Sequence, residues 1–152
     1  MDCPLPAGKT TCAMNTDKPG PALLCRVDCV RFPVEDLESG LAFYRDALGL
    51  ELLWRDGDSA GLRMPVDGTE IVIHTRGGSP ETDLLVQNAD EAARAIVEAG
   101  GSVKVSPFDI RIGRCCVVRD PWGNELVLLD CSKGLLNTDE HGNVTGNLPP
   151  LE

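Results

Sequence analysis

The feature of this sequence that most constrains its fold is an internal repeat with a period of about 52 residues. Val34 and Val86 lie 52 positions apart, Gly49 and Gly100 lie 51 apart, and each pair holds the same place in two similar stretches. Each stretch is predicted to form a strand, a helix and three further strands. We therefore expect an α+β fold that consists of two βαβββ modules.

Both predicted helices begin and end at residues that are typical of helix termini. In the first module Asp36 precedes the helix as its N-cap, and Gly49 follows the last turn. In the second module Asn88 and Glu91 form a capping box, and Gly100 stops the helix.

The predicted strands are separated by strong turn signals. Asp56-Gly57 and Asp67-Gly68 lie between runs of alternating apolar and polar residues, which is the usual pattern of a β-hairpin. The strands are expected near residues 23–34, 50–55, 59–66, 69–75, 81–87, 102–106, 112–119 and 124–130.

The segments that flank the repeat differ from it in composition. The N-terminal stretch is rich in Pro, Thr, Lys and Gly, lacks the hydrophobic region of a secretory signal, and is expected to be flexible. The polar C-terminal stretch is expected either to form a short hairpin around Gly142-Asn143 or to be partly disordered. The chain is thus divided into a leader at residues 1–22, a domain at 23–131 with modules at about 23–76 and 81–131, and a tail at 132–152.

Charge and length exclude several classes of partner. The chain has 152 residues, enough for one domain with a real core. It carries 14 basic and 24 acidic residues, for a net charge of −10, and has no basic stripe, so we expect no nucleic-acid partner. No apolar run approaches the roughly 18–20 residues of a membrane span, so no membrane partner is expected.

The cysteines favour a reducing compartment. There are seven, an odd number, and none of them forms a C-x-x-C pair. Without a secretory signal, they are interpreted as reduced thiols that mostly serve as small core residues of a cytoplasmic protein.

The alternation of side chains along the strands divides the predicted sheet residues between two faces. One set is apolar and is expected to lie under the helices: Val30, Phe32, Val34, Ile71, Ile73, Leu84, Val86, Leu126 and Leu128. The other set contains ionisable groups from four strands: Cys29, Arg31, Val72, His74, Glu81, Asp83, Leu85, Glu125 and Val127. The second face is either a solvated surface or the lining of a cleft, and the convergence of these groups favours a cleft.

Two stretches, "VEDLESGLAFYRDALGL" and "DPWGNELVLL", resemble the vicinal oxygen chelate superfamily. That superfamily includes glyoxalase I, bleomycin- and fosfomycin-resistance proteins and extradiol dioxygenases. The resemblance covers about residues 23–131. It implies that the paired βαβββ modules form a cupped mixed sheet, and it implies a homodimer that completes the cavities.

The resemblance also implies where a metal would be held in such a protein. The four ligand positions, on the first and last strands of each module, fall at Cys29, His74, Glu81 and Val127. A valine side chain offers no lone pair, so the carboxylate that usually completes the site is absent. The arginine that grips glutathione in glyoxalase I would fall at Pro33. We therefore expect no metal and no other cofactor.

Small-molecule binding in the cup is the function that we expect, and whether catalysis follows is left open. The residues expected to line the binding site are Cys29, Arg31, Trp54, Met64, Phe108, Arg114, Glu125 and Val127, with His74 and Glu81 as candidate catalytic residues.

Three alternatives remain. The first is a metal-dependent glyoxalase-like or dioxygenase-like enzyme that uses Cys29, His74 and Glu81 with water as ligands of a divalent metal. The second is metal-free acid–base catalysis by His74 beside a carboxylate. The third is an interaction module in which the cup is vestigial.

Overall fold

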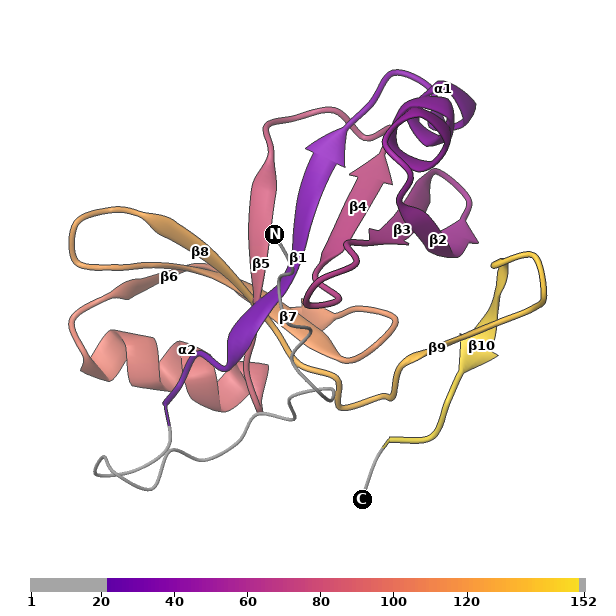
Figure 1. Ribbon diagram of the computed structural model, residues 1–152. Helices are drawn as coiled ribbons and strands as arrows, with labels where there is room; N and C mark the ends of the chain where they lie inside the picture. The colour runs from indigo at the N-terminus through magenta and orange to yellow at the C-terminus, as the bar shows by residue number, and fades with distance from the viewer. Residues whose placement is uncertain (1–21, 151–152) are drawn as a thin grey trace. The chain divides into compact units, whose positions relative to one another are not determined.

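The structure is a computed structural model that describes residues 22–150 (Figure 1). The predicted leader lies almost entirely outside the described residues. The chain divides into two compact units, one built mainly on residues 28–82 and the other on residues 83–135. Each unit contains one four-stranded array, and the two are described separately.

The first module has the predicted βαβββ order. Its four strands are arranged β2-β3-β4-β1, and β1 runs parallel to β4, whereas the other neighbours are antiparallel. The elements are β1 (Arg26–Pro33), α1 (Leu37–Leu41), a π-helical continuation η1 (Ala42–Ala47), β2 (Glu51–Asp56), β3 (Ser59–Arg63) and β4 (Glu70–His74).

The second module repeats this topology. Its strands are arranged β5-β8-β7-β6, again with one parallel pair, β5 and β8. The elements are β5 (Glu81–Leu85), α2 (Ala89–Glu98), β6 (Ser102–Asp109), β7 (Arg114–Arg119) and β8 (Glu125–Leu129). The predicted α+β class, with two βαβββ modules and mixed strand directions, is confirmed.

The helix caps predicted from the sequence are present. The Asp36 carboxylate accepts hydrogen bonds from the backbone N–H and the hydroxyl of Ser39, both at 2.8 Å. Asn88 Oδ1 accepts the backbone N–H of Glu91 at 2.9 Å. Gly49 and Gly100 both have positive φ, at 79° and 103°, a conformation that glycine adopts at little cost and that ends each helix.

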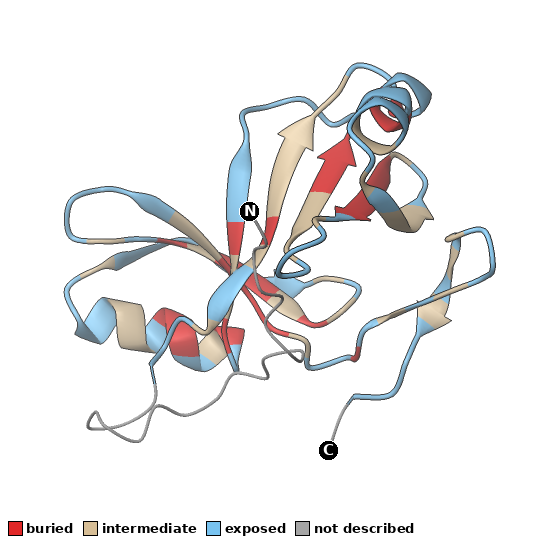
Figure 2. Ribbon diagram, viewed as in Figure 1, coloured by how far each residue is buried: buried red, intermediate tan, exposed pale blue. Residues whose placement is uncertain are grey.

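Each module has its own core between helix and sheet. Figure 2 shows buried residues in the N-terminal half of α2 and on β3 and β4 of the first module. The first core contains Leu37, Leu41, Ala60, Leu62 and Ile73, and the second contains Val86, Ala89, Ala92, Ala93, Cys116, Val118 and Leu128. The apolar face predicted to lie under the helices is thus the one that packs there.

The predicted C-terminal hairpin is also present. Strands β9 (Leu136–Thr138) and β10 (Val144–Asn147) are joined by a turn in which the Asp139 carboxylate accepts the backbone N–H groups of His141 and Asn143, at 2.8 and 2.9 Å. The turn reaches β2, because the backbone N–H of Arg55 donates to Gly142 O at 2.7 Å. This contact covers part of an edge strand, which would otherwise present unpaired backbone groups.

Some predictions require correction. Strand β3 ends at Arg63, before Pro65, because a proline cannot donate a backbone hydrogen bond to the ladder. Strand β6 continues to Asp109 through two irregularities in its pairing with β7. Cys25 is disulfide-bonded, so the prediction that the thiols are reduced is wrong for this residue, whereas Cys29, Cys115, Cys116 and Cys131 are thiols that form no disulfide.

Candidate functional site

The candidate site lies on the face of the first sheet that is opposite α1, which we call the back face. On β3 and β4 the residues that alternate with the core residues Ala60, Leu62 and Ile73 point to this face. The back face is formed by Cys29 and Arg31 of β1, Trp54 of β2, Gly61 of β3, and Glu70, Val72 and His74 of β4.

Trp54 reaches the back face because β2 contains a bulge. Strict alternation would put Leu52 and Trp54 on the same face, and Leu52 packs against the core. The register of β2 against β3 shifts between these two residues, so Trp54 pairs with Gly61 and is level with it across the two strands. A Cβ atom on Gly61 would lie only 2.0 Å from Trp54 Nε1, so the indole occupies the space above the glycine.

The indole is held in place by a polar contact. Trp54 Nε1 donates a hydrogen bond to Glu70 Oε1, a carboxylate on the next strand but one. The aromatic ring thus lies across β3, with Gly61 beneath it and Glu70 at its polar edge. An aromatic side chain positioned in this way offers a flat apolar wall.

His74, at the end of β4, is buried, with 7% of its surface exposed. Its Nδ1 accepts the backbone N–H of Arg76 at 3.2 Å. Burial lowers the pKa of His74, and the charges of Arg31 and Arg76 lower it further, against the opposing effect of Asp58 and Glu81. The imidazole is therefore neutral near pH 7, and its proton lies on Nε2, since Nδ1 is an acceptor.

Arg31 is the cationic group of the back face. It is half-buried, and within residues 22–150 its guanidinium has neither an ion pair nor a hydrogen bond. Its positive charge nevertheless lowers the pKa of His74, so the two side chains are close enough to interact electrostatically. The neighbouring Arg76 is different, because its Nε pairs with Asp58 Oδ2 at 2.9 Å.

The residues of the alternative metal site are not brought together. Cys29 is level with Glu70, whereas His74 is level with Pro33, four residues further along the parallel pair. Four residues of strand span roughly 13 Å, too far for ligands on one ion unless the strands distort. Glu81 is exposed at the first residue of β5. Among the described residues, no group of three His, Cys, Asp or Glu side chains is placed to hold a metal.

In the second module, Val127 is the residue at the implied metal position, and Glu125 lies two residues before it on the same strand. Both contact other residues of the module. Val127 is level with Asp83 on β5 and Val117 on β7. Glu125 pairs with Lys104 at 2.5 Å and lies 3.4 Å from Arg119, and the hydrogen bond from Lys104 keeps the pKa of Glu125 below its ordinary value.

Three further residues predicted for ligand binding do not belong to the set that forms the back face. Arg114 pairs with Asp90 of α2 at 2.8 Å and with Asp109 at 3.2 Å, so its guanidinium already has acidic partners. Phe108 is exposed on β6, level with Cys115. Met64 lies just beyond β3, where its backbone N–H donates to Thr69 O at 2.9 Å.

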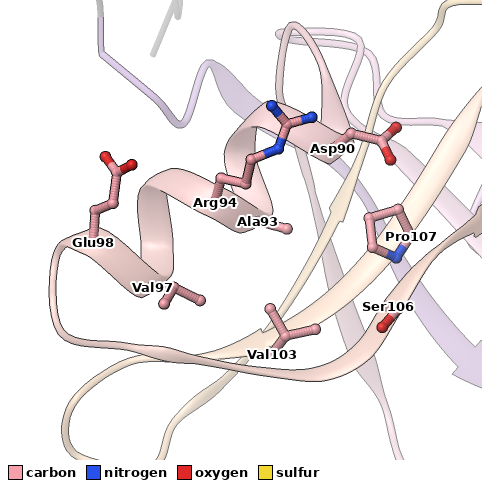
Figure 3. Close-up of a pocket in the computed structure, with 8 residues that line it drawn as sticks. All are labelled: Asp90, Ala93, Arg94, Val97, Glu98, Val103, Ser106 and Pro107. Carbon is pink, nitrogen blue, oxygen red and sulfur yellow. The ribbon is translucent and has the colours of Figure 1, made fainter.

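A groove of about 450 Å³ lies elsewhere, between α2 and β6. Figure 3 shows Val97 of the helix and Val103 of the strand across it from each other, with Ser106 and Pro107 at one end. None of the residues that the sequence predicted for ligand binding or catalysis lines this groove, which is open to solvent and has Asp90, Arg94, Glu98 and Ser106 among its lining residues.

Sequence reasoning missed the two residues that position Trp54. Gly61 was the detectable signal, because a glycine inside an otherwise well-patterned strand often marks the close approach of another group. Glu70 carried no local signal, since its pairing with the indole depends on the bulge in β2.

Comparison with known proteins assigns the chain to a family. Residues 26–128 match the sequence profile of the Glyoxalase/Bleomycin resistance protein/Dioxygenase superfamily, and the chain belongs to this superfamily. A search of curated proteins finds no match by sequence.

Solved structures share the fold at low identity. Methylmalonyl-CoA epimerase from Mycobacterium tuberculosis superposes with a TM-score of 0.60, at 19% identity over 72% of this chain and 89% of the epimerase. A protein from Bacillus halodurans gives 0.57, at 16% identity over 74% and 98%. Homoprotocatechuate 2,3-dioxygenase from Arthrobacter globiformis gives 0.50, at 22% identity over 70% and 36%. Likeness at these identities shows the fold alone.

Proposed function

We propose that this protein binds a small organic molecule on the back face of its first sheet and does so without a metal ion. The observation that carries the proposal is the position of Trp54, whose indole lies over Gly61 and is fixed by Glu70. The bulge turns the aromatic side chain out of the core, which reduces the apolar surface that is buried there. Bulges are common next to active sites, where they redirect a side chain.

The rest of the back face suits a ligand. Val72 pairs in register with Arg31 on one side and with Gly61 on the other and is buried, so an apolar residue separates the strand that carries the cationic side chain from the strand beneath the indole. Small-molecule sites typically combine apolar and aromatic walls with a few polar groups that fix orientation. The superfamily membership supports this proposal, because the epimerase and the dioxygenase that share the fold are named for small organic substrates.

The residues present do not fit the metal that the superfamily implies. Val127 cannot ligate, and Cys29 and His74 lie four residues apart along neighbouring strands. Catalysis through a metal is therefore not part of the proposal. The proposal includes the homodimer that the resemblance implies, and we expect the protein to form this dimer in solution.

Thermal unfolding in the presence of a library of planar compounds tests the proposal. A ligand of the native state at about 100 times its dissociation constant stabilises that state by about 2.7 kcal/mol, which raises the melting temperature by several degrees. Trp54→Ala is expected to abolish the shift. Trp122→Ala is the matched control, because Trp122, the other tryptophan of the chain, is 84% exposed in the turn between β7 and β8.

The proposal fails if no compound raises the melting temperature. It also fails if the compounds that do so act equally on the Trp54→Ala variant.

A further inference from the structure

Arg31 is a cationic side chain of the back face that has no acidic partner in the described part of the chain. A half-buried arginine loses part of its hydration, and an acceptor that replaces the lost water offsets this cost. Arg76, two residues beyond His74, has such a partner in Asp58, but in the described part of the chain no acidic group is within ion-pair distance of Arg31. Arg31 is thus available to an acceptor from outside.

His74 offers a second donor on the same face. Its Nδ1 is occupied by the backbone N–H of Arg76, so the neutral ring carries its proton on Nε2. Nε2 makes no hydrogen bond within residues 22–150 and is not closed off from solvent. A buried histidine with a fixed ring and one open N–H is pre-organised to donate to a ligand.

The spacing of these groups fits a small ligand. Arg31, Val72 and Gly61 are level on three neighbouring strands, so the backbone of Arg31 and the glycine beneath the indole lie roughly 10 Å apart, two strand spacings. His74 lies two residues beyond Val72, roughly 7 Å along β4. A flat molecule that spans this distance contacts the indole at one end and the two donors at the other.

The acidic residues that the sequence offers to a ligand do not make a cation the better candidate for the back face. The chain has a net charge of −10, and from the sequence alone the carboxylates of Glu81, Asp83 and Glu125 favour a cationic ligand. Glu125, however, is paired with Lys104, and Asp83 is buried. Glu81 is exposed and acts on His74 only through its charge, so solvent screens its effect on a ligand beside Arg31.

We propose that the ligand of the back face carries an oxyanion, a carboxylate or a phosphate, which Arg31 binds in its guanidinium fork while His74 Nε2–H donates a further hydrogen bond. This inference rests on the proposed function and adds the chemical class of the ligand. Arginine suits the role because its planar fork matches both oxyanions, and charge-assisted hydrogen bonds are the strong ones.

Four probes of similar shape test the charge preference: benzoate, phenyl phosphate, benzamide and benzamidinium. Titration of the isotopically labelled full chain, followed by the shift of the Trp54 indole N–H signal, gives a dissociation constant for each. We expect at least one of the two anions to bind with a dissociation constant about tenfold lower than that of benzamide. A difference of this size corresponds to one charge-assisted hydrogen bond. We expect benzamidinium to bind more weakly than both anions.

Variants assign the preference to its residues. Arg31→Gln is expected to remove the advantage of the anions over benzamide, and Arg31→Lys to retain part of it. Arg94→Gln is the matched control, because Arg94 is exposed on α2 and its removal changes the net charge by the same amount. The anion advantage should survive in this control, and the melting temperature of each variant verifies that it is folded.

The outcomes separate this inference from the proposed function. If all four probes shift the Trp54 signal with similar affinity, or if benzamidinium binds best, the back face binds ligands but the inference is overturned. The same conclusion follows if the anions are preferred equally in wild type and in Arg31→Gln. If no probe shifts the signal, then both the inference and the proposed function are contradicted.

Discussion

Gly61 is the residue on which the shape of the back face depends. A Cβ atom at this position would lie 2.0 Å from Trp54 Nε1 and 2.2 Å from Glu70 Oε1, so Gly61→Ala must displace the indole or its partner. We predict that this variant stays folded, because the displaced groups lie outside the core, and that it binds ligand at least several-fold more weakly. Thermal shift with a compound that stabilises wild type provides the measurement.

A double-mutant cycle gives the control for this prediction. If Gly61 acts only by making room for the indole, Gly61→Ala should have no further effect on binding in a Trp54→Ala background. Equal losses in both backgrounds would show that the glycine matters for another reason.

Asp130 is the residue that joins three elements of the second module. Its carboxylate is 2% exposed and accepts the backbone N–H groups of Ala89, Arg114 and Ser132, at 2.8, 2.9 and 3.1 Å. The Ser132 hydroxyl donates as well, at 2.7 Å. Burial alone would raise the pKa of Asp130, but these hydrogen bonds together lower it below its ordinary value.

We predict that Asp130→Asn lowers the free energy of unfolding at neutral pH by roughly 2–4 kcal/mol, because buried donors lose a charged acceptor. A depressed pKa in the folded state contributes stability above the unfolded value of about 3.9, and this contribution is lost as the pH falls through the folded value. The difference between wild type and variant should therefore shrink toward acid pH.

Denaturant unfolding from about pH 7 to about pH 3 measures that difference. Asp46→Asn, which changes an exposed carboxylate on η1, serves as the control and should change little at any pH. A stability loss in Asp130→Asn that stays constant down to the lowest pH would contradict the role assigned to the charge.

At the scale of the elements, local chemistry made much of the fold predictable. Asp36 and Asn88 cap their helices as expected, and the Asp-Gly turns join β2 to β3 and β3 to β4, because these signals act within a few residues. The sheet face on which Trp54 lies could not be predicted from the alternation of side chains, because a bulge in β2 shifts that alternation by one residue. The distance between Cys29 and His74 depends on the register of a parallel pair, which no local signal specifies.

Two turns of the chain share one design and allow a matched comparison. In Asp120–Asn124 and in Asp139–Asn143 the aspartate accepts two backbone N–H groups and the side-chain amide of the asparagine. The second turn also places Gly142 O against the backbone N–H of Arg55. We predict that Asp139→Ala loosens this contact and speeds hydrogen exchange of the Arg55 amide severalfold, as expected for local opening.

The Asp120→Ala variant is the control for that measurement. It disrupts the same kind of turn between β7 and β8 and should leave the exchange of Arg55 unchanged. An equal acceleration in both variants would mean that Arg55 exchanges by global unfolding and that the hairpin does not protect β2.

At the scale of the whole molecule, the fold is shared with enzymes of different chemistry, so the site alone can indicate the activity. In the described part of the chain, no helix is long and apolar enough to cross a membrane. The homodimer and the cytoplasmic location that the sequence suggested stay predictions. Sedimentation equilibrium measures the first, and a mass equal to one chain at all concentrations would contradict it.

The central claim is that a small molecule binds on the back face, against Trp54. The chain has two tryptophans, and so two indole N–H signals in a proton–nitrogen correlation spectrum. Titration with a compound that raises the melting temperature should shift the Trp54 signal progressively to saturation while the signal of the exposed Trp122 stays in place. A saturating compound that leaves the Trp54 signal unmoved, or that moves only the Trp122 signal, would contradict the claim.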